Sequence, residues 1–357
     1  MKYRHTEIQA SIDLGPSGTR VFDIDLIDPI SRITVLFLPV GGSDTPAAHP
    51  AASVEKIEVV DGSDVLYSLS GQEIQALNII EADKVATAFI YYTTGGTPYM
   101  VFNLDFGRWL FDPELALLPG NFSNLQLKIT WNEVTWDASC SAHAFIIYGH
   151  VFDEKAISPI GFLMNKEIKS YTGQAAGYEY TDLPTDHVIR KLMLQGWRKQ
   201  YTVRNIIETI KLSEDNDKRV PINGDIYELR GFLDPLAGEC SDLICLKATT
   251  GGLRAYCTPG QFYNVVGNTD NATDDLQITG LAGNTFVAVT AAGTKVCNLR
   301  VRGRNPHNCF GIPFGDQKDL ADWYDVAGLG NLKLRIKGGG GAASGSTNIV
   351  TQQLRRY

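Results

Sequence analysis

The sequence lacks the closely spaced cysteines and histidines that hold metal ions in small domains. Its 357 residues include six cysteines without a C-x-x-C pair, and six histidines spread over the chain. We therefore predict no zinc site. A disulfide staple among Cys240, Cys245 and Cys257 would require an oxidising environment. The expectation is free, buried thiols at Cys140, Cys240, Cys245, Cys257, Cys297 and Cys309.

The sequence also lacks long apolar runs and an excess of lysine and arginine over aspartate and glutamate. The N-terminal residues 1–7 contain no signal-peptide core, and nowhere do about 18 apolar residues run together, which predicts a protein made and kept in a cytoplasm. The net charge of −8 argues against direct or sequence-specific nucleic-acid binding. An anionic surface such as lipid headgroups could still meet local basic residues: Lys2, Arg4, Arg190, Lys191, Arg198, Lys199, Arg204, Arg355 and Arg356.

Catalytic and cofactor motifs are absent as well. There is no G-x-S-x-G nucleophile elbow. There is also no H-x-H pair, because His143 and His150 lie seven residues apart. The run Gly338–Gly341 is not followed by the Lys-Ser/Thr of a phosphate loop, so it predicts a flexible turn. We therefore expect no enzyme, no cofactor and no metal.

Two polar clusters remain as candidates. Glu133 and Asp137 lie near Trp131 and Trp136, as the carboxylates and sugar platform of a glycosidase would. Packing of the tryptophans in a core explains them more simply. An acidic cluster could bind calcium, although its spacing misses the EF-hand pattern and a solvated loop is the simpler interpretation: Asp270, Asn271, Asp274 and Asp275.

Alternation of apolar and polar residues at a period of two indicates an all-β chain. In the first half it predicts strands at residues 33–38, 54–60, 65–69, 88–92, 99–104, 125–131 and 144–151. In the second half it predicts strands at 192–197, 206–212, 219–222, 332–337 and 349–354, with further runs at 277–278, 285–290 and 296–301. Short helices are expected at 71–77, 108–118 and 316–324.

The second half repeats the first in order. Phe22-Asp23-Ile24 returns as Tyr178-Glu179-Tyr180, and Leu69-Ser70-Gly71 as Ile222-Asn223-Gly224, both about 155 residues later. The later block Asn124–Ile129 returns at residues 331–336, about 207 residues on. Two steady offsets separated by one jump predict a duplicated domain with a single insertion between Leu229 and Phe314.

The repeat fixes the expected domain limits. Residues 1–18 should form an N-terminal arm, 19–160 the first jelly roll, and 161–357 the second, with an inserted β subdomain at about 232–305 projecting from the second barrel. The glycines and prolines of residues 155–177 predict a connection between the domains.

The residues 57–77 and 332–357, each with strands and small-residue turns, resemble the double jelly-roll major capsid proteins of tailless icosahedral viruses, notably membrane-containing bacteriophages. The resemblance implies two tandem eight-stranded jelly-roll barrels, and a homotrimer whose pseudo-hexagonal outline tiles an icosahedral shell. It implies a virion protein synthesised in the host cytoplasm, with neighbouring trimers, minor capsid, penton or spike proteins and an internal viral membrane as candidate partners. The insertion would be a tower or rim loop, and the N-terminal arm would reach inward or towards a neighbouring trimer.

Two other functions stay open from the residues alone. A carbohydrate-binding or receptor-attachment protein, such as a virus spike, would use Trp131 or Trp136 to bind glycans. A β-sandwich hydrolase would use Glu133 or Asp137.

Overall fold

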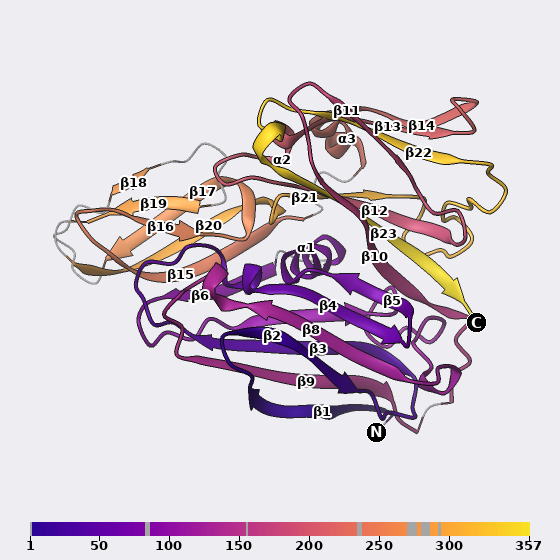
Figure 1. Ribbon diagram of the computed structural model, residues 1–357, viewed down its shortest axis with the longest axis horizontal. Coiled ribbons are helices and arrows are strands. Elements are labelled where there is room, and N and C mark those ends of the chain that lie inside the picture. The colour runs from indigo at the N-terminus through magenta and orange to yellow at the C-terminus, as the bar shows by residue number, and fades with distance from the viewer. Residues whose placement is uncertain are drawn as a thin grey trace.

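The computed structural model describes residues 2–82, 86–154, 156–233, 238–269, 277–279, 286–291 and 294–357. It is built mainly of antiparallel strands, as the alternating sequence predicts (Figure 1). No helix among these residues has the length and apolar character needed to cross a bilayer. The predicted calcium cluster at 270–275 lies outside the described residues.

The first half folds into two facing sets of four strands. The orders are β1-β9-β3-β7 and β2-β8-β4-β5. Their inward side chains, including Val35 of β3 and Leu127 of β8, share one core. The strands are β1 (Tyr3–Asp13), β2 (Ser17–Asp23), β3 (Ile30–Val40), β4 (Val54–Asp61), β5 (Asp64–Leu69), β7 (Met100–Asp105), β8 (Leu125–Asn132) and β9 (Ala142–Phe152).

The second half repeats this strand order. Its sets are β10-β23-β12-β21 and β11-β22-β13-β14, so each strand has a counterpart in the first half, as a duplicated domain requires. Parallel pairing of Tyr67 in β5 with Asn165 in β10 joins the two halves in one eight-stranded sheet. The strands are β10 (Gly161–Thr172), β11 (Tyr178–Asp182), β12 (Val188–Trp197), β13 (Ile207–Glu214), β14 (Arg219–Asp225), β21 (Cys309–Pro313), β22 (Leu332–Gly338) and β23 (Ser346–Arg356).

Helices occupy matching places in the two copies. α1 (Gly71–Glu81) follows β5 and α3 (Ile226–Leu233) follows β14. α1 begins with a capping box: the Ser70 hydroxyl accepts from the Glu73 amide, and the Glu73 carboxylate accepts from the Ser70 amide. The other helical turns are α2 (Val203–Ile206), η1 (Pro50–Ser53), η2 (Pro119–Asn121), η3 (Glu133–Thr135) and η4 (Ala342–Ser344).

The insertion forms a projecting lobe together with one strand of the first half (Figure 1). We define this lobe as the sheets β17-β20-β15-β6 and β16-β19-β18. β6 belongs to the first half but pairs in parallel with β15, and the buried face of the lobe joins the first core, so the lobe does not project from the second barrel alone. Its strands are β6 (Ala86–Tyr92), β15 (Cys240–Ala248), β16 (Leu253–Tyr256), β17 (Pro259–Thr269), β18 (Gln277–Thr279), β19 (Phe286–Thr290) and β20 (Lys295–Pro306).

Several local predictions are wrong. Residues 3–13 of the expected arm form β1 and pair with β9, and residues 161–172 of the expected connection form β10. Residues 108–118 and 316–324 form turns instead of helices. Aspartates fix these turns, because Asp112 accepts from Glu114 N and Asp316 from Lys318 N, and such local bonds compete with a helix.

Candidate functional site

The predicted sugar platform is buried. Trp131 and Trp136 are 3% and 1% exposed, and the Trp131 ring packs 5.5 Å from that of Phe145. The Trp131 indole N–H donates to the Gly15 carbonyl. Neither tryptophan face is free to stack on a sugar, so these residues serve the core of the first jelly roll.

Asp137 fastens two loops together. One carboxylate oxygen accepts from the amides of Gly42 and Ser43, at 3.0 and 2.9 Å, and the other accepts from the Ser139 amide at 2.9 Å. A Cβ atom at Gly42 would meet the Ser139 backbone, so glycine is required for this approach. With its oxygens engaged by backbone amides, Asp137 has a structural role.

Glu133 lies in a different setting. It is 1% exposed and its carboxylate contacts the Nδ1 atom of His143, a side chain of β9 that points into the core. Cys140 lies close by, and one ligand atom from each of the three residues falls within 4.8 Å of the others. The expectation that no histidine stands close to a cysteine is wrong here, because Cys140 and His143 are three residues apart.

The other predicted site residues have structural partners. The Nε2 atom of His150 lies 2.8 Å from Thr34 Oγ1, and burial lowers the pKa of His150 to about 4. The glycine run packs closely instead of flexing, because a Cβ at Gly339 would lie 2.5 Å from the Asn205 carbonyl oxygen. The amides of Gly339 and Gly341 donate to backbone carbonyls, so they cannot cradle a phosphate. All six cysteines are free, and four are buried.

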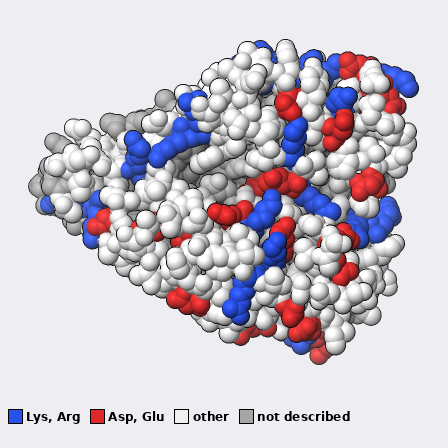
Figure 2. Space-filling model, viewed as in Figure 1, with Lys and Arg blue, Asp and Glu red and all other residues white. Residues whose placement is uncertain are grey.

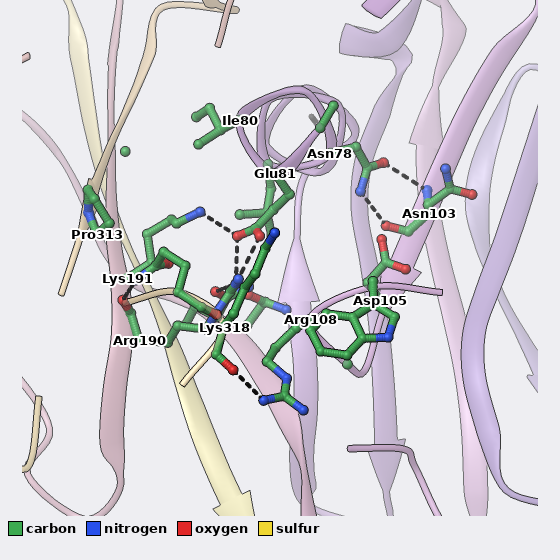
Figure 3. A pocket seen from close by; sticks show the side chains of 18 of the residues that line it. Asn78, Ile80, Glu81, Asn103, Asp105, Arg108, Arg190, Lys191, Pro313 and Lys318 are labelled. Carbon is green, nitrogen blue, oxygen red and sulfur yellow. Dashed lines mark hydrogen bonds and ion pairs between the residues drawn. The ribbon is translucent and has the colours of Figure 1, made fainter. Parts of the chain in front are cut away.

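A polar cavity of about 830 Å³ lies between the two halves, and its lining comes from both (Figure 3). At the end of α1, Glu81 points toward Arg190 and Lys191 of β12, and both Glu81 oxygens accept from Arg190, at 2.8 and 2.9 Å. Burial raises the pKa of Glu81, but Lys191 and Arg190 outweigh it and hold the pKa below its usual value. Arg190 and Lys191 are thus buried between the halves and do not face an anionic surface.

The outer face of the lobe carries several exposed apolar side chains, next to the polar Asn298 and Arg300. β6 alternates Phe89 and Tyr91, which are 54% and 41% exposed, with the buried Ile90 and Tyr92. Val266 of β17 is 61% exposed on the same face, and these residues line a groove of about 550 Å³. Figure 2 shows charges of both signs over the surface, with Lys and Arg side chains also lying across the lobe. The lobe therefore offers exposed apolar side chains for contact beside basic ones.

Solved structures with the same fold are viral capsid proteins. The STIV major capsid protein, from Sulfolobus Turreted Icosahedral Virus, matches with a TM-score of 0.61 at 11% identity, over 100% of this chain and 98% of its own. The major capsid protein P2 of bacteriophage PM2 matches with a TM-score of 0.57 at 9% identity, over 99% and 98%. A chain of the PBCV-1 virus capsid matches at 0.52 and 10%, over 99% and 93%. No family model and no curated protein matches the sequence.

Proposed function

We propose that this protein is a viral major capsid protein that assembles as homotrimers. The observation that carries the proposal is the exact correspondence of strand order between two jelly rolls in one chain, within a fold that solved capsid proteins share over nearly their whole length. Three chains with two similar barrels each would present six similar faces, and such an outline tiles a closed shell. The two jelly rolls of one chain can differ in sequence at the positions where they contact different neighbours.

The proposed role is structural. Within the described residues, the predicted catalytic carboxylates are buried or engaged by backbone amides, and the tryptophans of the glycan-binding alternative are buried. In the virion, the partners would be neighbouring trimers and minor capsid, penton or spike proteins. Contact with an internal membrane would depend on exposed basic residues such as Lys199 and Arg356, because the other basic candidates are mostly paired or buried.

The purified protein should be a trimer with a six-sided outline. Light scattering coupled to gel filtration should give about three times the 39.1 kDa chain mass, since an obligate interface of roughly 2,000 Å² or more resists dilution. Negative-stain images should show the outline directly. A monodisperse monomer across the concentration range would contradict the proposal.

We propose that the outer face of the lobe makes part of the trimer contact. Replacing Phe89 or Val266 with aspartate should weaken association roughly 30-fold or more, as expected for an interface hot spot of about 2 kcal/mol. Sedimentation equilibrium measures the change. Ile27→Asp is the control, because Ile27 is 90% exposed and does not line the groove of the lobe. Equal weakening by all three variants would argue against a specific role of the lobe.

A further inference from the structure

Three residues from one segment of the first jelly roll converge at the end of β8. Glu133 opens η3, Cys140 lies in the following loop and His143 lies on β9. The turn is held by backbone bonds from Trp136 N and Asp137 N to the Glu133 carbonyl, at 2.9 and 2.8 Å. Asp137 in turn ties the loop to Gly42 and Ser43. These hydrogen bonds fix the backbone that carries the three side chains.

The polar atoms of this group are poorly satisfied. Glu133 Oε2 lies against His143 Nδ1, whereas Oε1 has no hydrogen-bond partner among the described residues, although the side chain is 1% exposed. A buried carboxylate without hydrogen bonds is costly, so such a group is usually paired or coordinates a metal. The contact with His143 supplies one neighbour for two oxygens.

We propose that Glu133, Cys140 and His143 form a binding site for Zn²⁺. The ligand atoms of the three residues, one each of oxygen, sulfur and nitrogen, lie within 4.8 Å of one another. Zinc binds these three types at about 2.0–2.3 Å, which places the ligands of one ion roughly 3–4 Å apart, so Glu133 and His143, which are in direct contact, would move apart around the ion. A thiolate favours a borderline-soft ion over calcium or magnesium, which take oxygen ligands. Three protein ligands leave the fourth tetrahedral position to water.

The proposed ion would staple the loop after η3 to β9. His143 would bind through Nδ1, the ring nitrogen that lies against the Glu133 carboxylate. Cys140 donates from Sγ to the Val40 carbonyl at 3.1 Å, and on binding it would lose that proton to the buffer and coordinate as the thiolate. The site does not depend on trimer formation, because all three ligands belong to one chain.

Metal titration of the full chain tests the proposal. After treatment with a chelator, calorimetry with Zn²⁺ should give one ion per chain, and added Zn²⁺ should raise the melting temperature. Co²⁺ in place of zinc should produce a cobalt–thiolate absorption band. Cys140→Ser should abolish that band, and Cys140→Ser and His143→Ala should each weaken zinc binding by at least about 100-fold, the upper end of the loss caused by removing an outer-shell partner.

Cys245→Ser is the matched control, because Cys245 is the other partly exposed cysteine and lies in the lobe. It should leave the stoichiometry, the melting shift and the cobalt band unchanged. The proposal is overturned if the parent chain binds no Zn²⁺, or if Cys140→Ser keeps the cobalt–thiolate band. If His143→Ala does not fold, Cys140→Ser still decides, since it changes one atom of a partly exposed side chain.

Discussion

Replacing Glu81 with alanine should lower the free energy of unfolding by about 3–5 kcal/mol, the usual cost of breaking a buried ion pair from one side. Arg190 has 3% of its side chain exposed and Glu81 20%, so the remaining guanidinium would be left inside the protein. Among the described residues, the other side chain that accepts a hydrogen bond from Arg190 is Gln352, at 2.6 Å, which is uncharged. Urea unfolding followed by circular dichroism measures the change.

The same ion pair should make stability fall in acid. The pKa of Glu81 lies below its usual value of 4.5, so the pair contributes its full stability above that value and loses it as pH falls through the lower, folded-state pKa. Glu81→Gln should flatten this part of the curve of unfolding free energy against pH. An unchanged slope below pH 4.5 in the variant would show that the pair does not couple folding to pH.

Asp28→Ala is the control for the buried pair. Asp28 accepts from Arg4 at 2.7 Å, but their side chains are 40% and 45% exposed, so the loss should be below about 1 kcal/mol. Because Glu81 joins α1 of the first half to β12 of the second, its loss should also loosen the junction between the halves. If both substitutions cost the same, burial is not what gives the Glu81 pair its strength.

The alternation of apolar and polar residues and the repeated sequence blocks predict those parts of the fold that are specified by residues close together in the chain. The strands β3 to β9, the first helix and the order of the repeat were predicted in this way, whereas β1 and β2 were missed. The glycines and prolines at both ends of β10, among them Pro159, Gly161 and Gly173, predict a connection and hide the strand between them. Its partners β5 and β23 are far away in sequence, and a strand of this kind is recognised by its pairing.

The lobe shows the same limit more clearly. β6 was correctly predicted as a strand, but its parallel partner β15 starts about 150 residues later and nothing local to either strand specifies that pairing. The candidate metal site could be predicted only in part from the sequence. Cys140 and His143 stand at a spacing that metal ligands use, whereas Glu133 was proposed only as a catalytic carboxylate paired with Asp137. The η3 turn separates those two carboxylates into different surroundings, and a turn of three residues leaves little trace in sequence.

Replacing Trp136 with alanine should cost about 3–5 kcal/mol, as large-to-small changes of aromatic residues in cores do. Trp136 is among the largest fully buried side chains, at 1% exposure, and it packs beside Gly41 under the loop that carries Asp137. Thermal unfolding followed by near-UV circular dichroism measures the loss. Trp136→Phe should cost less, because it also removes an indole N–H that has no hydrogen-bond partner among the described residues.

Trp109→Ala provides the comparison, since Trp109 is 44% exposed and the Arg108 guanidinium lies 4.4 Å from the centre of its ring. Its removal should cost about 1 kcal/mol or less. The contrast also separates the two interpretations of Trp136. A core residue should lose stability on truncation, whereas a glycan platform should lose binding with the fold intact. A folded Trp136→Ala variant of near-parental stability would contradict the core assignment and reopen the glycan-binding alternative.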